Sequence, residues 1–177
     1  EVRSPVCLSE GSQISPFCMG SFPSMGPAQA LAAVDAADKA WNYGAGEWPT
    51  MRVVDRIRCV EDLAQAMASR REEVSRLLMW EIGKTWSDSL KEFDRTLDYI
   101  RCTLDAVKEL DRASSRFLHE EGILAQVRRA PLGVTLCMGP YNYPLNETYT
   151  TLIPALIMGN PVVFKPSRPG SLLHRPL

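Results

Sequence analysis

The amino-acid sequence predicts an α/β fold, in which an N-terminal layer of helices is followed by the opening βαβ unit of a parallel sheet. Residues 27–121 are rich in helix formers and repeat their apolar side chains every three or four positions. Residues 133–165 instead contain two short apolar runs that flank a helical pattern of about 14 residues, as a βαβ unit does. One such unit cannot cover both faces of its sheet, so we expect an incomplete sheet.

The N-terminal residues give no periodic signal. Residues 1–26 mix Ser, Pro and Gly with scattered apolar side chains, which predicts an irregular lead-in. An alanine-rich run from Ala28 to Trp41 predicts a helix of about 14 residues, because alanine is the best helix former. Gly44 and Gly46 are expected to follow its end.

Three further amphipathic helices are predicted before the strands begin. Thr50 is the expected N-cap of a helix that reaches Met67, and the next helix spans roughly residues 71–82. Ser87 is the expected cap of the last, whose apolar residues recur at spacings of three and four up to Val107. This seam could indicate a coiled coil, but it lasts under three heptads and favours a long helix within a helical layer.

The last third of the chain changes to the pattern of strands. Residues 122–129 predict one strand, and residues 133–138 predict a second, buried strand because they are apolar almost throughout. A helix is expected from residue 145 to 158, and Pro161–Lys165 is the third strand. The crossover between the second and third strands should be right-handed. The chain begins at Glu1 and stops where another helix should start, so we expect a truncated domain.

Composition and charge exclude several classes of partner. The chain has 177 residues, 45% of them hydrophobic and 23% charged, and a net charge of −1, as in ordinary globular proteins. This balance gives no reason to expect nucleic acid or an anionic membrane as a partner, and no apolar run could span a bilayer. The five scattered cysteines and the isolated His119 and His174 predict neither a disulfide framework nor a metal site. Reduced thiols indicate a cytoplasmic protein.

Asn142 is the first candidate for chemistry. It lies in the sequence P-Y-N-Y-P just past the end of the predicted buried strand, where open α/β sheets form their ligand crevice. An amide held at such a turn can donate hydrogen bonds to a developing oxyanion. The alternative is an Asx-type turn, in which the side chain satisfies the backbone between Pro140 and Pro144.

Three polar residues follow the next strand, in the sequence K-P-S-R. Lys165, Ser167 and Arg168 place two cations and a hydroxyl at a strand end, which suits the ribose or the 2′-phosphate of a nucleotide. The alternative is a solvated basic loop. No G-x-G-x-x-G or Walker A sequence is present, and Cys137 lies within an apolar strand, so the residues alone identify no nucleophile.

The ordered pattern P-Y-N-Y-P-L-N, followed by P-A-L-I-M-G-N-P-V-V-F-K-P, resembles the NAD(P)-dependent aldehyde dehydrogenase superfamily. The segment C-M-G-P-Y-N-Y-P most resembles the corresponding segment of the NADP-dependent, non-phosphorylating glyceraldehyde-3-phosphate dehydrogenases. The resemblance implies an incomplete aldehyde dehydrogenase-like fold with a Rossmann-like sheet. Residues 27–121 would then be the helical part of the cofactor-binding domain, residues 122–131 a strand of the hairpin that bridges subunits, and residues 132–177 the truncated start of the NAD(P)-binding domain.

The resemblance also implies roles in binding the cofactor. Met138 and Tyr141 would line the nicotinamide side of the cofactor cleft, and Lys165 would bind the adenosine ribose. Arg168 stands where NAD-preferring relatives often carry glutamate, and with Ser167 it would favour NADP, with NAD as the other possibility.

Further roles are implied in binding and converting the aldehyde. Tyr143 and Arg95 would bind a phosphate on the substrate, although a solvated helix face explains Arg95 equally well. A cysteine thiolate would attack the aldehyde, Asn142 would hold the oxyanion, hydride would pass to NADP, and a glutamate would activate water. The family's cysteine, glutamate and G-S-x-x-x-G segment are absent from these residues, so the chain alone is expected to be inactive.

Three functions follow from the sequence. The first is the N-terminal portion of an oxidoreductase that converts an aldehyde, by resemblance glyceraldehyde 3-phosphate, to the acid with NADP. Its full-length form would be a homodimer or homotetramer. The second is a non-catalytic binding or assembly module. The third is an aldehyde dehydrogenase that acts on an unphosphorylated aldehyde.

Overall fold

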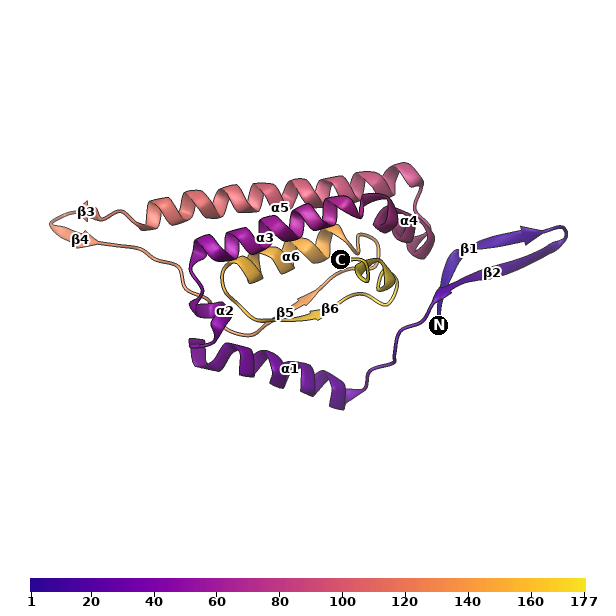
Figure 1. The fold of residues 1–177 in the computed structure, drawn as a ribbon, viewed down its shortest axis with the longest axis horizontal. Coiled ribbons are helices and arrows are strands. Elements are labelled where there is room, and N and C mark those ends of the chain that lie inside the picture. The colour runs from indigo at the N-terminus through magenta and orange to yellow at the C-terminus, as the bar shows by residue number, and fades with distance from the viewer.

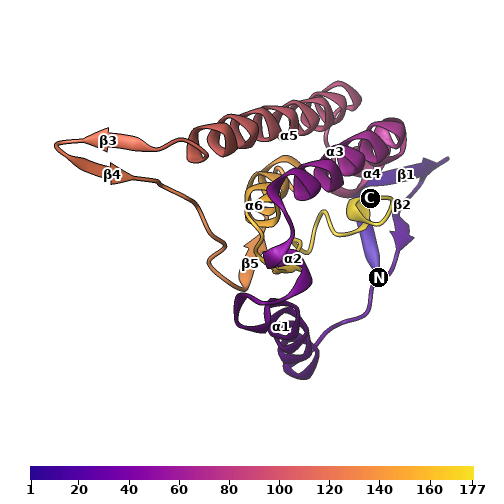
Figure 2. The ribbon, with the colours of Figure 1, turned by 60° about the vertical axis from the view of Figure 1, so that its left-hand side comes forward.

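The computed structural model describes residues 1–177 as a helical body with two projecting hairpins. Figure 1 shows α5, α3 and α6 stacked above the β5–β6 pair, α1 below it, and the two hairpins at opposite ends. In the turned view of Figure 2 the β3–β4 hairpin still projects from the body, while β1 and β2 lie beside α4. The helices are α1 (Pro27–Trp41), α2 (Glu47–Thr50), α3 (Val53–Ser69), α4 (Arg71–Ile82), α5 (Trp86–Ser114) and α6 (Asn146–Ile157), with short 3-10 turns η1 (Asn42–Gly44) and η2 (Leu172–His174).

Strands occur in three separate pairs. They are β1 (Val2–Glu10) with β2 (Gln13–Gly20), β3 (Leu118–Glu120) with β4 (Ile123–Ala125), and β5 (Thr135–Met138) with β6 (Val162–Lys165). Only β5 and β6 are parallel, and α6 joins them, so the predicted βαβ unit is confirmed. None of the helices combines the length and apolar character that crossing a bilayer would require.

The helical layer is confirmed, with corrections at two of its caps. The predicted helix over residues 71–82 is α4, which ends because Gly83 adopts a left-handed conformation with φ 76°. Thr50 is not an N-cap but the last residue of α2, and its hydroxyl donates to the carbonyl of Gly46 over 2.7 Å. Thr85, rather than Ser87, caps α5, since its hydroxyl oxygen accepts a hydrogen bond from the backbone N–H of Asp88.

The hydrophobic core lies where α5 crosses α3, α4 and α6. The apolar seam of α5 supplies Phe93, Leu97, Ile100 and Leu104, all of them buried. Each such side chain stabilises the fold by about 1.5–3 kcal/mol through burial. The seam therefore packs within one helical layer, as predicted, and not in a coiled coil.

The expectation that residues 1–26 are irregular is wrong. β1 and β2 form an antiparallel hairpin around the two-residue connection Gly11–Ser12, in which Gly11 has φ 63°. Pro5 lies within β1, but it falls in a shift of the pairing register between Arg3 and Cys7, where its missing N–H removes no ladder bond.

The single strand predicted over residues 122–129 is also wrong in its extent. β3 and β4 form a short hairpin whose turn residues, Glu121 and Gly122, both have positive φ. Beyond β4 the chain has no neighbouring strand to pair with. Instead, the side-chain amide of Gln126 donates to the carbonyl of Ser114 over 2.9 Å, at the end of α5.

Candidate functional site

The carboxyl ends of β5 and β6 meet at one edge of the parallel pair. Met138 is paired with Lys165 in the parallel register, so the segments that follow both strands start side by side. The hydroxyl of Ser167 then donates to the carbonyl of Pro140 over 3.1 Å, which ties the two segments together. We call residues 139–145 the first loop and residues 166–171 the second loop. Ligands of open α/β sheets bind at this edge.

Close packing against α6 fixes the first loop. The hydroxyl of Thr148 donates to the carbonyl of Pro144 over 2.5 Å. A Cβ atom on Gly139 would overlap the Oγ1 atom of Thr148, so only glycine fits at the start of the loop. Gly170 of the second loop, at φ 95°, lies against the ring of Pro144 in the same way.

A buried carboxylate supports the first loop from below. Glu92 of α5 accepts hydrogen bonds from the backbone N–H groups of Leu145 (3.0 Å) and Asn146 (3.2 Å), at the N-terminus of α6. It also forms an ion pair with Lys84, whose ammonium lies 3.7 Å from the centroid of the Tyr143 ring. A negative charge at a helix N-terminus is favourable, and a cation over an aromatic face is too.

A second buried carboxylate supports the second loop. Glu81, at the end of α4, accepts hydrogen bonds from the consecutive backbone N–H groups of Ser171, Leu172 and Leu173. Neither Glu81 nor Glu92 was a candidate from the sequence. Their partners are backbone amides far along the chain, and a backbone amide leaves no signal in the residue pattern.

Asn142 lies exposed in the first loop. Its side chain is exposed and forms no hydrogen bond within the chain. An Asx-type turn would require such a bond to the local backbone, so the geometry disfavours that alternative. Met138 and Tyr141 are exposed beside it, and Lys165 is exposed at the end of β6 without an ion-pair partner.

Ser167 and Arg168 both lie in the second loop. The hydroxyl of Ser167 donates to the backbone carbonyls of Pro140 and Pro169, so it ties the two loops together. Arg168 is exposed and lines a cavity of about 420 Å³ together with Glu81 and the N-terminal residues Glu1 and Arg3.

Arg95 is not the cation that lies over the Tyr143 ring. It is exposed on α5 without an ion-pair partner, and the cation that contacts the Tyr143 ring is Lys84. Sequence reasoning missed Lys84, although it follows Gly83, the residue that ends α4.

Cys137 cannot act as a nucleophile at this edge. It is 1% exposed, and burial raises the pKa of its thiol, so the reactive thiolate is disfavoured. No group of His, Cys, Asp or Glu side chains is arranged to hold a metal ion. The four exposed cysteines lie on other elements, namely Cys7 on β1, Cys18 on β2, Cys59 on α3 and Cys102 on α5.

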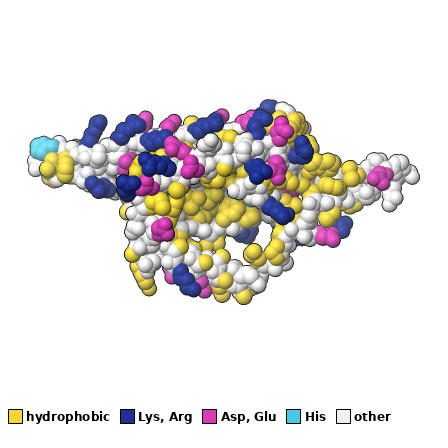
Figure 3. Space-filling model, in the orientation of Figure 1, with side chains coloured by type: hydrophobic (Ala, Val, Ile, Leu, Met, Phe, Trp, Pro, Cys, Tyr) yellow, Lys and Arg dark blue, Asp and Glu magenta, His cyan; other side chains and the backbone are white.

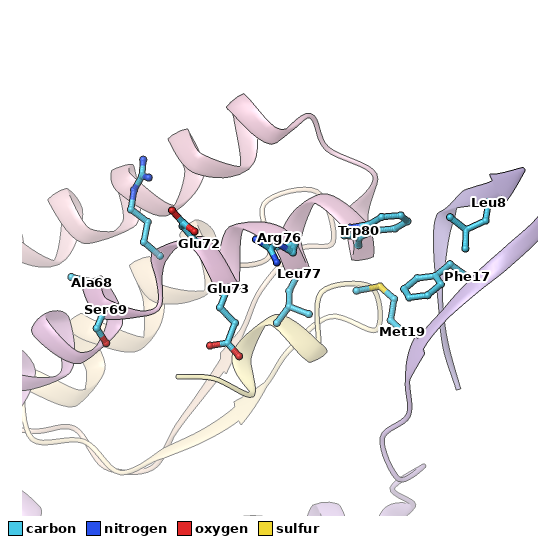
Figure 4. A pocket seen from close by; sticks show the side chains of 11 residues that line it. Leu8, Phe17, Met19, Ala68, Ser69, Glu72, Glu73, Arg76, Leu77 and Trp80 are labelled. Atoms are coloured by element: carbon cyan, nitrogen blue, oxygen red, sulfur yellow. The ribbon is translucent and has the colours of Figure 1, made fainter.

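A cavity of about 1020 Å³ lies away from the strand ends, between the β1–β2 hairpin and α4. Figure 4 shows Phe17 close to Trp80, with Leu8 and Met19 beside them. The rings of Phe17 and Trp80 are 5.2 Å apart, so apolar packing holds the hairpin to α4. None of the predicted site residues lines this cavity.

Comparison with known proteins places the chain in context. Residues 11–175 match the model of the aldehyde dehydrogenase family. An N-succinylglutamate 5-semialdehyde dehydrogenase of Chromobacterium violaceum is 32% identical over 142 residues, which cover 80% of this chain and 29% of that protein. An NADP-dependent glyceraldehyde-3-phosphate dehydrogenase of Streptococcus equinus is 29% identical over 161 residues, which cover 87% of this chain and 32% of that protein.

The fold agrees with a solved structure from the same group. The NADP-dependent glyceraldehyde-3-phosphate dehydrogenase of Bacillus halodurans C-125, solved with NADP, superposes with a TM-score of 0.77 at 30% identity. The match covers 95% of this chain and 35% of that one. The chain thus spans about a third of the length of the proteins it resembles. Since the family match takes in both loops at the strand ends as well as the helices beneath them, the chain belongs to the aldehyde dehydrogenase family.

Proposed function

We propose that these residues are the N-terminal part of an NADP-dependent oxidoreductase that converts glyceraldehyde 3-phosphate to the corresponding acid. The observation that carries the proposal is the pairing of Met138 with Lys165. This pairing sets the first loop, which contains Asn142, beside the second loop, which follows Lys165, at one sheet edge. Residues 27–121 and 132–177 would both belong to the cofactor-binding domain. The thiol nucleophile and the general base would come from sequence outside these 177 residues, so the chain alone would be inactive. The enzyme would act in the cytoplasm.

The residues present fit a phosphorylated dinucleotide. Lys165 and Arg168 are exposed cations without ion-pair partners that follow the same strand, and a 2′-phosphate would neutralise them. NADP, when bound, would accept the hydride from the aldehyde. Asn142 would donate its free amide protons to the substrate oxyanion, while Met138 and Tyr141 would provide exposed surface beside the nicotinamide.

Nucleotide binding by the 177-residue chain tests the proposal. We expect 2′,5′-ADP to bind at least about tenfold more tightly than 5′-AMP, because one charge-assisted hydrogen bond contributes roughly 1.5–3 kcal/mol. Lys165→Ala and Arg168→Ala should both abolish the difference in calorimetric titrations. Lys39→Ala, which removes an exposed lysine of α1, is the matched control. Equal affinity for the two nucleotides would refute the NADP preference.

A second substrate class is favoured by one specific contact. The cation over the Tyr143 ring is Lys84, and Arg95 is exposed on α5, so the contacts that Tyr143 makes do not by themselves require a phosphate on the substrate. Relatives named N-succinylglutamate 5-semialdehyde dehydrogenase fit this alternative of an unphosphorylated aldehyde. In a longer enzyme that contains these residues, Arg95→Met should raise KM for glyceraldehyde 3-phosphate but not for glyceraldehyde if the phosphate is bound there. Arg101→Met on the same helix is the control.

An assembly role is supported by the β3–β4 hairpin. Ile123 and Leu124 are about two-thirds exposed at 67% and 65%, on an arm that projects from the body (Figure 1). We propose that this arm pairs subunits into a homodimer or homotetramer. If the chain acts only as an assembly module, adding it to an intact homologous enzyme should change the mass of the oligomer while the chain itself binds no nucleotide.

A further inference from the structure

We propose that Glu81 and Glu92, with Lys84, are positioning residues that hold the two strand-end loops in a fixed relation. All three lie in the short corner where α4 passes into α5. The inference rests on the proposed function, since the loops are those that carry Asn142 and lead from Lys165. Nothing in the motif pattern assigns a role to this corner.

Glu92 fixes the first loop at its exit into α6. Its side chain is 1% exposed, and one carboxylate oxygen, Oε1, accepts from the N–H groups of both Leu145 and Asn146. The other oxygen, Oε2, is the one that pairs with Lys84. Next to it, the side-chain amide of Asn146 donates to the hydroxyl of Thr96 over 3.4 Å, so the start of α6 is bound to α5 at two points.

Lys84 extends the same network to Tyr143. Its side chain is 16% exposed, with the ammonium between the carboxylate of Glu92 and the ring of Tyr143. Tyr143 directly follows Asn142, so the contact restrains the backbone on the C-terminal side of the candidate oxyanion donor. The packing of Gly139 against Thr148 restrains the N-terminal side.

Glu81 plays the matching part under the second loop. It is 3% exposed, and its two oxygens accept from three consecutive N–H groups at distances of 2.8–3.2 Å. These groups belong to Ser171, Leu172 and Leu173, at the point where the second loop ends in η2. The carboxylate thus caps the short turn and sets the path of the chain back toward Lys165.

Positional control explains these carboxylates better than stability does. A buried charge is costly, and replacing a buried ion pair by apolar side chains is often neutral or stabilising. An apolar side chain at either position could fill space but could not accept two or three directed amide hydrogen bonds. The corner between α4 and α5 therefore sets the positions of both loops. Through them it sets the distance between Asn142, the proposed oxyanion donor, and Lys165, the proposed ribose ligand.

Backbone amide exchange in the complete 177-residue chain tests this inference. Glu92→Gln should speed hydrogen exchange at Leu145 and Asn146, and Glu81→Gln should speed it at residues 171–173, each by roughly tenfold or more through the loss of charge-assisted bonds. Each variant should leave the other loop unchanged. Asp98→Asn, an exposed carboxylate of α5 paired only with Arg101, is the control. Faster exchange throughout the chain in either variant would overturn the inference.

A second readout covers the case in which a glutamine variant fails to fold. Lys84→Met should shift the Tyr143 ring resonances in NMR spectra, and Lys84→Arg should restore them because a guanidinium can also lie over the ring. Unchanged resonances in Lys84→Met would overturn the role of Lys84. In calorimetry, Glu81→Gln should weaken 2′,5′-ADP binding by roughly tenfold while Glu92→Gln should not, since only the second loop follows Lys165. A wild-type chain that binds no 2′,5′-ADP would reject the proposed function, whereas the exchange pattern would still decide the positioning role.

Discussion

At the scale of single residues, Asn142 is the side chain on which the proposed chemistry depends most. In a longer enzyme that supplies the nucleophile, Asn142→Ala should lower kcat by at least about a hundredfold, as the loss of one oxyanion donor does elsewhere. NADPH formation in a single turnover measures the effect directly. The side chain is exposed and forms no hydrogen bond within the chain, so the free energy of unfolding should not change. Asn42→Gly, at an exposed left-handed position, is the control, and an unchanged kcat in Asn142→Ala would reject the oxyanion role.

His174 makes the stability of the chain depend on pH. It stacks on Tyr149 and meets the edge of Phe164, and neither ring nitrogen has a hydrogen-bond partner. Burial lowers its pKa from 6.5 to about 4. Between these values the unfolded chain binds more protons than the folded chain, so the stability is full above pH 6.5 and falls as the pH drops toward 4. The loss should reach about 3 kcal/mol at most.

Urea unfolding at a series of pH values checks this expectation. His174→Phe should flatten the part of the pH dependence that lies between 4 and 6.5, since phenylalanine fits the aromatic surroundings and does not titrate. His119→Gln, on the exposed β3 strand, should leave the profile as it is in the wild-type chain. A wild-type profile that His174→Phe does not alter would show that the histidine titrates normally.

At the scale of elements, the contact between the end of β5 and α6 sets the first loop. Gly139→Ala should destabilise the chain by about 2 kcal/mol, because the new methyl group overlaps Thr148. Thr148→Ala removes the Oγ1 atom and, with it, the hydrogen bond to Pro144. The double variant should therefore lose less free energy of unfolding than the sum of the single variants. Strict additivity in urea titrations would contradict the proposed clash.

Elements with strong local signals could be predicted from the sequence. The bounds of α4 match the prediction because Gly83 takes the left-handed conformation that its position suggested, and the βαβ unit follows from its two apolar runs. The β1–β2 hairpin could not be predicted in this way. Its strands carry two prolines and little core, and Pro5 is tolerated only because the pairing register shifts around it.

The residues of the candidate site also differ in whether the local sequence indicates them. The placement of Asn142 and Lys165 at one sheet edge was predictable, because Asn142 lies in the segment after one recognisable strand, Lys165 ends the next, and the two strands pair in parallel. Glu81 and Glu92 were not, because their hydrogen-bond partners lie 90 and 53 residues away in sequence. A contact between a side chain and a distant backbone amide depends on the complete fold, and no local pattern encodes it.

At the scale of the whole molecule, the parallel strand pair is only partly covered. Helix α6 packs on one side, where Cys137 is buried, while Leu136 and Met138 on the opposite side of β5 are 60% and 53% exposed. Figure 3 shows hydrophobic side chains gathered over the middle of the molecule, while the charged side chains gather mainly along its upper helices. Each strand of the pair also has a single partner, so both outer edges offer unpaired backbone groups.

This open sheet should make the chain associate with itself. Apolar patches and free strand edges both favour pairing with another chain, and only 34 of 177 residues are buried within this one. We expect sedimentation velocity to show a sedimentation coefficient that rises with concentration. Leu136→Lys should raise the monomer fraction, because it places a charge on the open face next to both edges. Val54→Lys, which changes an exposed apolar residue of α3, should have little effect. If the two variants associated equally, the contact would lie elsewhere, and the uncovered face of β5 and β6 would not be what drives the chain to assemble.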